Sequence, residues 1–263
     1  MELPDRTAVM GVLNVTPDSF YDGGRYDDVD DAVARAEQMV EQGADIVDVG
    51  GESTRPGGDP LPVEEELGRV RPVLERLDLD VPVSIDTRKP AVAEAALDLG
   101  ADIVNDVTGL GDAAMRELVA DRGCDAVIMD AVNIPVDPDA ASPYDDVVAD
   151  VKQRLQENVE QARAAGVADD QIIVDPGFGF GKGYDGDRAI LQNIDAFTDL
   201  DYPVIFGCSR KSFFGHEFGL EKENRLEVSV AANVLAAYHG VNVVRVHDVK
   251  ETVRALKVAD MLR

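Results

Sequence analysis

The chain has few of the residues that build disulfides and transition-metal sites. Its 263 residues include two cysteines, Cys124 and Cys208, and three histidines. Both cysteines lie in or next to apolar runs, which favours buried free thiols over a disulfide. His216, His239 and His247 lack the spacing of a metal-ligand set, so we expect no catalytic transition metal.

Long apolar runs and positive charge are also scarce. No apolar stretch approaches the ~20 residues of a membrane-spanning helix, and the first residues lack the basic-then-apolar order of a signal peptide, so we expect a cytoplasmic protein. The 52 acidic residues outnumber the 25 basic ones, which gives a net charge of −27. This charge repels nucleic acids and anionic membranes, and we expect neither as a partner. Any anionic ligand therefore needs a local basic pocket.

The acidic residues recur along nearly every expected helix instead of forming one tail. Ions at high concentration screen the mutual repulsion of such a surface, so we hypothesise that the protein is halophilic. A melting temperature that did not change between dilute buffer and molar KCl would reject this hypothesis.

The chain does contain a repeated alternation of strand and helix patterns. Strands that alternate with amphipathic helices form parallel βαβ units, and eight units in about 250 residues are typical of a closed (β/α)8 TIM barrel. The length matches one such domain and no linker divides the chain, so we predict a single domain over residues 1–263. The predicted strands are Thr7–Leu13, Asp45–Val49, Val81–Ile85, Asp102–Val104, Asp125–Met129, Ile172–Val174, Val204–Phe206 and Val241–Val246.

Glycines and a proline mark the ends of the predicted helices. Apolar residues repeat at helical spacing between Val29 and Gln42, and Gly43 follows as a stop signal. Pro90 lies near the start of another helical pattern, which Gly100 ends. Gly43, Gly100 and Gly240 each stand just before a predicted strand, so the repeating unit is a helix, a glycine and a strand.

Three connections after predicted strands are longer than a structural turn needs: 14–24, 50–62 and 130–143. The strand ends of a TIM barrel carry its active site, so these loops are expected to cover a substrate there.

Two carboxylates and an amide follow predicted strands, namely Asp86, Asn105 and Asp175. Together they can match the N–H donors and acceptors of a flat heterocycle with a guanidine-like face, such as a pterin. Each residue taken alone could equally cap the helix that follows it. The segment after Asp175 does not fit a nucleotide P-loop, but it supplies Phe178 and Phe180, which could stack on a flat ligand.

Basic residues gather after the last two predicted strands: Arg210, Lys211, Arg245 and His247. In so acidic a protein this cluster indicates an anion such as phosphate or pyrophosphate, although ion pairs with neighbours such as Asp248 are the alternative. Asn14 follows the first strand and could bind Mg²⁺, which often takes few protein ligands beside phosphates and water.

The chain shows no pair of nucleophile and base. Residues 207–211 do not match G-x-S-x-G, and three histidines leave little material for a catalytic triad. A substitution that expels a good leaving group, by a nucleophile that needs only positioning, fits these residues better than hydrolysis.

Taken together, these segments resemble the dihydropteroate synthase family of folate biosynthesis. Residues 14–24 and 50–57 resemble the two mobile loops of that family. The resemblance extends over nearly the whole chain and several unconnected motifs. The remaining motifs match in order at Ser84–Thr87, Asn105–Val107, Asp175–Lys182, Ser209–Ser212 and Arg245–Val249.

The resemblance implies a reaction in which the amine of p-aminobenzoate attacks the methylene of a dihydropterin pyrophosphate and expels pyrophosphate. It also implies binding roles for several sets of residues. The pterin set is Asp86, Asn105, Met129, Asp175, Gly207 and Lys211; the pyrophosphate set is Asn14, Arg245 and His247, with Mg²⁺ beside Asn14; the p-aminobenzoate set is Thr54, Arg55, Pro56, Phe180 and Ser212. The expected catalytic residues are Lys211, Arg245 and His247.

The family resemblance also implies a homodimer through late helices. An apolar face that could serve either the dimer or the barrel core consists of Leu226, Val230, Val234, Ala237 and Tyr238.

The sequence departs from the family at Asp130. The family usually has Met-His-Met after the fifth strand, whereas Met129 is followed here by Asp130. We expect altered loop geometry more than lost activity. Two alternatives stay open: a pterin-dependent methyltransferase on the same barrel, which needs no pyrophosphate pocket, and a non-catalytic pterin-binding paralogue in which Asp130 marks decay.

Overall fold

A computed structural model describes residues 3–15, 27–52, 61–132, 134 and 144–262 of the chain. Its centre is a parallel eight-stranded sheet in the order β6-β5-β4-β3-β2-β1-β8-β7. A bridge between Val174 and Val204 joins β6 to the start of β7 and closes the sheet. The strands are β1 (Ala8–Asn14), β2 (Ile46–Gly50), β3 (Val83–Asp86), β4 (Ile103–Asp106), β5 (Asp125–Met129), β6 (Ile172–Asp175), β7 (Ile205–Phe206) and β8 (Val243–Val246).

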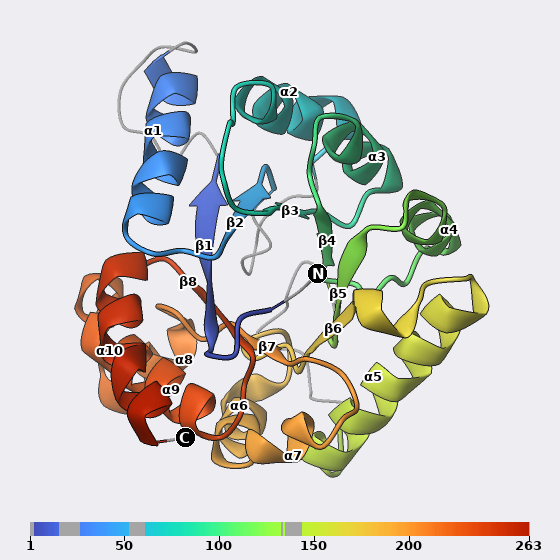
Figure 1. The fold of residues 1–263 in the computed structure, drawn as a ribbon. Helices are drawn as coiled ribbons and strands as arrows, with labels where there is room; N and C mark the ends of the chain where they lie inside the picture. The colour runs from blue at the N-terminus through green and yellow to red at the C-terminus, as the bar shows by residue number, and fades with distance from the viewer. Residues whose placement is uncertain (1–2, 16–26, 53–60, 133, 135–143, 263) are drawn as a thin grey trace.

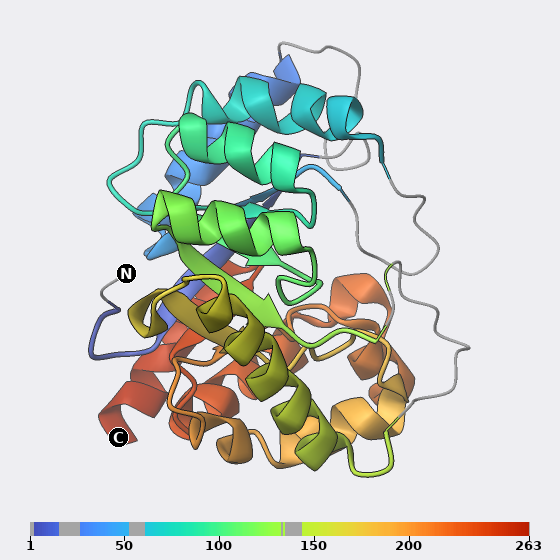
Figure 2. The ribbon, with the colours of Figure 1, turned by 90° about the vertical axis from the view of Figure 1, so that its right-hand side faces the viewer.

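Helices surround this sheet, as Figure 1 shows. In the side view of Figure 2, α2 to α5 stack one below another along one side of the barrel. The predicted (β/α)8 barrel is therefore confirmed. The helices are α1 (Asp27–Glu41), α2 (Val63–Leu74), α3 (Pro90–Asp98), α4 (Ala113–Arg122), α5 (Val147–Ala164), α6 (Gly183–Gln192), α7 (Asp195–Thr198), α8 (Ser212–Phe218), α9 (Leu226–Tyr238) and α10 (Val249–Leu262), with 3-10 turns η2 (Asp169–Gln171) and η3 (Lys222–Asn224).

The glycine stop signals have a physical basis in the structure. Gly43, Gly100 and Gly240 follow α1, α3 and α9 with φ angles of 98°, 97° and 100°. This left-handed backbone is strained for residues with a Cβ atom, so glycine favours the end of the helix there. The predicted helix–glycine–strand unit is confirmed at these three positions.

The barrel interior is filled by inward-facing apolar residues from seven of the eight strands, two of them from β1 and none from β3. Successive side chains on a strand point to opposite faces, so residues two apart along a strand share the interior. This inner layer is buried and consists of Ala8, Met10, Ile46, Ile103, Val127, Ile173, Ile205 and Val243. A larger apolar layer lies between the strands and the helices.

None of the described helices is long and apolar enough to cross a membrane. Cys124 and Cys208 are free thiols, as predicted, and Cys208 is fully buried.

Candidate active site

The site is the next inward-facing layer of the barrel. Two residues beyond the apolar layer, toward the strand ends, the same face carries four polar residues, one methionine and one glycine. The step leads from Ile46 to Asp48, from Ile103 to Asn105, from Val127 to Met129, from Ile173 to Asp175, from Ile205 to Gly207 and from Val243 to Arg245. The local alternation of the strands therefore delivers these side chains to one mouth.

Arg245 is the central cation of this layer. Its Nε lies 2.7 Å from Asp48 Oδ2, and its Nη2 lies 2.5 Å from the same oxygen and 2.6 Å from Asp86 Oδ2. Asn105 Nδ2 donates to Asp48 at 3.3 Å. Of the predicted ligand residues, Asp86 thus contacts the predicted anion residue Arg245 directly, and Asn105 is linked to Arg245 through Asp48.

Asp48 is not among the site residues predicted from the sequence. Its side chain is fully buried, because it lies on the inner face of β2 below the barrel mouth. The available signal was an acidic residue inside the otherwise apolar strand Ile46–Gly50. An unpaired carboxylate there would carry a large desolvation cost, so an inward Asp in a barrel strand indicates a cationic partner.

The carboxylates of the mouth have raised pKa values. Burial raises the pKa of Asp86 to about 7; Arg245 lowers this pKa, and Asp48 raises it. Burial also raises the pKa of Asp175, although the backbone N–H of Gly177 and the charge of Lys211 oppose the shift. Gly177 N donates to Asp175 Oδ1 at 2.7 Å. Arg245 therefore stabilises the ionised form of Asp86, and the Gly177 N–H and Lys211 stabilise the ionised form of Asp175.

Lys211 lies beside Phe180, with its Nζ 3.9 Å from the centre of the ring. Burial and the positive charge of Arg245 together lower the pKa of Lys211 to about 8. Phe180 is half-buried and available to a ligand, whereas Phe178 is 1% exposed and packs against Phe206 and Phe213. The expectation that Phe178 stacks on a ligand is therefore wrong, because its ring is part of the core.

The basic cluster at the last strands divides into two parts. Arg210 is bound by Asp248 through two hydrogen bonds of 2.7 Å, so for this residue the ion-pair alternative is correct. His247 lies with its Nδ1 3.2 Å from Ser209 Oγ, and its backbone N–H donates to the same oxygen. Lys211 and Arg245 are thus the cations that face the carboxylates of the mouth.

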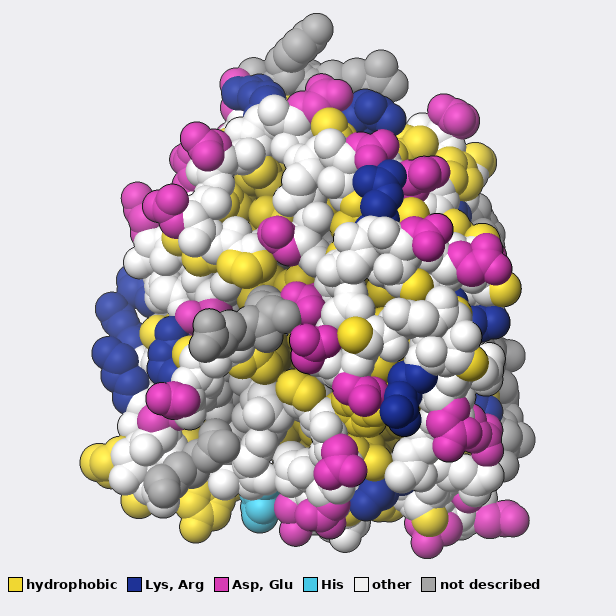
Figure 3. Space-filling view, turned by 45° about the vertical axis from the view of Figure 1, so that its right-hand side comes forward, with side chains coloured by type: hydrophobic (Ala, Val, Ile, Leu, Met, Phe, Trp, Pro, Cys, Tyr) yellow, Lys and Arg dark blue, Asp and Glu magenta, His cyan; other side chains and the backbone are white. Residues whose placement is uncertain are grey.

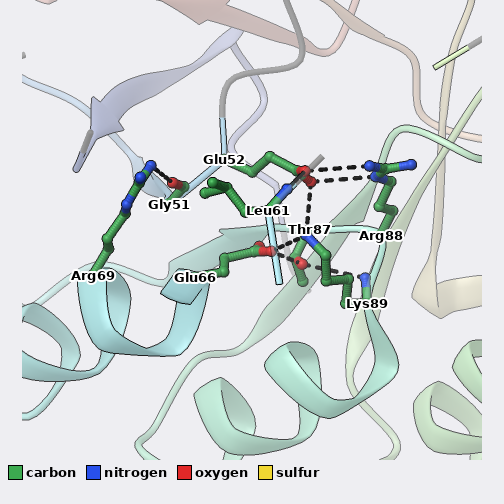
Figure 4. A network of polar contacts seen from close by, with 8 residues as sticks. All are labelled: Gly51, Glu52, Leu61, Glu66, Arg69, Thr87, Arg88 and Lys89. Atoms are coloured by element: carbon green, nitrogen blue, oxygen red, sulfur yellow. Dashed lines mark hydrogen bonds and ion pairs between the residues drawn. The ribbon is translucent and has the colours of Figure 1, made fainter. Parts of the chain in front are cut away.

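A second polar network lies behind the end of β3 (Figure 4). Glu52 accepts from Lys89 Nζ at 2.9 Å, from Arg88 and from the backbone N–H of Leu61 at 2.8 Å. Fully buried Glu66 accepts from Lys89 and from Thr87 Oγ1. This network holds the turn directly after Asp86 in place.

Asp130, the departure from the family pattern, is also fully engaged. Its carboxylate lies 3.0 Å from Lys182 Nζ and 2.6 Å from Arg154 Nε, and it accepts from Tyr144 at 2.7 Å. Its side chain and that of Lys182 are completely buried. The aspartate therefore has a defined structural environment.

The other predicted ligand residues take several positions. Asn14 ends β1, Met129 ends β5 and is 6% exposed, and Ser212 is exposed at the start of α8. The predicted p-aminobenzoate residues Thr54, Arg55 and Pro56 lie outside the described residues, as do most residues of the three predicted covering loops.

Comparison with known proteins identifies the family. Residues 10–247 match the model of the pterin binding enzyme family. The dihydropteroate synthase of Bacillus subtilis is 42% identical over 98% of this chain and 89% of its own length. The chain belongs to the pterin-binding enzyme family.

The chain is also similar to a second curated protein and to a solved structure. A probable bifunctional folylpolyglutamate synthase/dihydropteroate synthase of Haloferax volcanii is 53% identical over 97% of this chain, which spans only 30% of that protein. The structure of a Clostridium difficile dihydropteroate synthase, determined in the presence of pteroic acid, superposes with a TM-score of 0.94 at 42% identity. The superposition covers 100% of this chain and 98% of the Clostridium difficile chain.

Proposed function

We propose that this chain is a dihydropteroate synthase, which joins a dihydropterin pyrophosphate to p-aminobenzoate and releases pyrophosphate. The observation that carries the proposal is the arrangement of the barrel mouth: a carboxylate suited to a pterin edge lies within hydrogen-bonding distance of a cation suited to a pyrophosphate, and the Asn105 amide joins the same network through Asp48. The pair of Asp86 and Arg245, at 2.6 Å, is the clearest example.

The pterin lies against the acidic side of the mouth in this proposal. Asp86 and Asp175 accept N–H groups of the ring, while Asn105 can donate and accept. Met129 and Gly207 border the flat ligand, and the Lys211 ammonium donates to a ring acceptor. The raised pKa values of the two carboxylates are consistent with a buried site that binds a polar edge.

In the chemical step, the arylamine nitrogen attacks the methylene carbon, and the bond from that carbon to the pyrophosphate oxygen breaks. The electron pair leaves with the pyrophosphate, and the secondary ammonium formed by the attack gives one proton to solvent, which leaves the neutral secondary amine. Arg245, Lys211 and His247 offset the charge that grows on the leaving group. The p-aminobenzoate is held by Phe180, Ser212 and the 54–56 segment, and its orientation replaces activation by a dedicated base.

Mg²⁺ fits this site only as a partner of the bound pyrophosphate. No three His, Cys, Asp or Glu side chains of the described chain are grouped so as to hold a metal ion. Asn14 at the end of β1 offers one amide oxygen, which suits an ion that keeps phosphate and water ligands. When bound there, Mg²⁺ adds positive charge beside the leaving group.

Two observations favour the synthase over the alternatives. A methyltransferase has no use for the pyrophosphate set, whereas two members of that set, Arg245 and His247, are present here together at the carboxyl end of β8. The reading of a decayed paralogue depended on Asp130, and that residue is bound by three side chains.

The domain organisation, the cellular location and the oligomeric state are also proposals. We propose one domain that acts in the cytoplasm as a homodimer. The predicted apolar face could serve either the dimer or the barrel core; its Ala237 is fully buried in its own chain, whereas its Tyr238 is exposed. We place the pairing surface on α9 and α10, whose exposed apolar side chains are Leu235, Tyr238, Val258, Met261 and Leu262. Analytical ultracentrifugation of Leu235→Glu, which is expected to yield monomers, tests this surface.

The halophilic character also stays a proposal. Figure 3 shows Asp and Glu scattered over the visible face, with fewer Lys and Arg, which agrees with the net charge of −27. A melting temperature that rises with KCl concentration is the expected result.

The test of the activity is pyrophosphate release in molar KCl with Mg²⁺, dihydropterin pyrophosphate and p-aminobenzoate, each omitted in turn. Release that requires both organic substrates supports the synthase. Lys211→Ala and Arg245→Ala are expected to lower kcat/KM by about 100-fold or more. Arg76→Ala, which removes an exposed cation paired with Asp30 on the surface, is the matched control and should retain activity. Pterin binding without release would favour the binding-protein alternative.

A further inference from the structure

We propose that Asp130 and Lys182 form a buried positioning pair for Asp175, the carboxylate that faces the pterin. The inference rests on the proposed function, since it assigns to the pair an effect on one of the two substrates. Neither residue was among the predicted ligand residues, and the pair involves the position at which this chain departs from its family.

The first observation is the environment of the Lys182 ammonium. Its Nζ donates to the backbone carbonyl of Asp130 at 2.7 Å and to that of Gly177 at 3.0 Å, and it lies 3.0 Å from Asp130 Oδ2. An ammonium group has three N–H donors, so these three acceptors satisfy it fully. Lys182 therefore ties the end of β5 to the turn after β6.

The second observation is that the same turn holds Asp175. Gly177 N donates to Asp175 Oδ1 at 2.7 Å, and Asp130 N donates to the Asp175 carbonyl at 3.0 Å. Gly177 has a φ of 66°, and a Cβ atom there would lie 1.8 Å from the Asp130 carbonyl oxygen. The turn is thus packed directly against Asp130, and a displacement of either strand end moves the Asp175 carboxylate.

The third observation is the charge balance. Burial lowers the pKa of Lys182, and the carboxylate of Asp130 opposes this shift. Because both side chains are fully buried, the ammonium depends on this neighbour to stay charged. Asp130 is thus a matched partner of Lys182 in this chain.

Loss of the pair is expected to affect the binding of one substrate more than that of the other. A change at Asp130 weakens the hold on the Asp175 turn, so it raises the KM for dihydropterin pyrophosphate. On the proposed p-aminobenzoate side, Ser212 forms no hydrogen bond or ion pair with Asp130 or Lys182 among the described contacts. Phe180 reaches the pair only through its backbone N–H, which donates to the Gly177 carbonyl at 3.1 Å, so the KM for p-aminobenzoate changes much less than the KM for dihydropterin pyrophosphate. A merely structural role would alter the melting temperature without this difference between the two substrates.

The experiment compares Asp130→Asn, the double variant Asp130→Asn/Lys182→Met and the control Arg154→Gln. The control removes another partner of the same carboxylate, one that is 45% exposed. For each protein, both KM values, kcat, the melting temperature and the Kd of a dihydropterin without pyrophosphate are measured.

We expect Asp130→Asn to raise the pterin KM and Kd by about 10-fold or more, as is typical when a group that orients a ligand residue is removed. The control should change either KM by less than about twofold. The double variant removes both buried charges, so it should regain melting temperature while its pterin KM stays raised. It also keeps the comparison possible if the single variant does not fold.

Equal changes in both KM values, no change in the pterin Kd, or a double variant that regains normal pterin binding would overturn the positioning role. A wild-type chain that binds the dihydropterin but releases no pyrophosphate would refute the synthase alone, because the Kd comparison still decides the role of the pair. A wild-type chain that binds no pterin would overturn both.

Discussion

Asp48→Asn offers a quantitative test of the electrostatics of the mouth. Arg245 Nη2 lies 2.5 Å from Asp48 Oδ2 and 2.6 Å from Asp86 Oδ2, so these two carboxylate oxygens are within about 5 Å of each other. Two unit charges at that separation repel by about 3 kcal/mol at an effective dielectric constant of about 20, which corresponds to about 2 pH units. This repulsion is one cause of the raised Asp86 pKa, which is about 7.

The expected effect follows from the sign of this interaction. In the wild type, Asp86 becomes protonated as the pH falls through about 7, so kcat/KM for dihydropterin pyrophosphate should decline on the acid side. Removal of the Asp48 charge makes Asp86 easier to ionise. The acid midpoint should therefore move to lower pH by at least about 1 unit, the full Coulomb value being reduced as Arg245 relaxes.

The assay is initial-rate pyrophosphate release from about pH 5 to pH 9 at constant ionic strength. Both proteins receive the same substrate, so the titration of its pyrophosphate cancels in the comparison. Asp45→Asn is the matched control, because Asp45 pairs with Arg6 at 2.6 Å outside the mouth. A midpoint that stays in place or rises in Asp48→Asn would refute the reasoning.

Three further outcomes are expected. Activity should also decline as the pH rises through about 8, where Lys211 loses its proton, and Lys211→Ala should lack this alkaline step in the pH profile of its residual rate. Gly177→Ala should lose about 2 kcal/mol or more in the free energy of unfolding by denaturant melting, while Gly123→Ala, with a similar φ of 63° and open space around its Cβ, should lose less. Glu66→Ala should lose about 3 kcal/mol or more in the same assay, since Lys89 is left with Glu52 alone; a loss below about 1 kcal/mol would contradict a buried pair.

The sequence determined the architecture of the barrel and the residues at its strand ends. Strand and helix periodicity are local properties, so the eight predicted strands correspond to the observed ones within a few residues at each end. Asp86, Asn105 and Asp175 were found because a polar side chain directly follows an apolar run. The helix stops at Gly43 and Gly100 were equally readable, because a left-handed backbone restricts the choice of residue.

Only the tertiary structure decided how these side chains pair. Asp48 and Arg245 are 197 residues apart, and closure of the barrel alone brings them to 2.7 Å. The same closure buries Phe178 in the core, although its neighbour Phe180 reaches the mouth. The Asp130 carboxylate pairs with the ammonium group of Lys182, which is 52 residues later in the chain. Such pairings depend on the curvature and register of the whole sheet, which the order of residues along one strand does not contain.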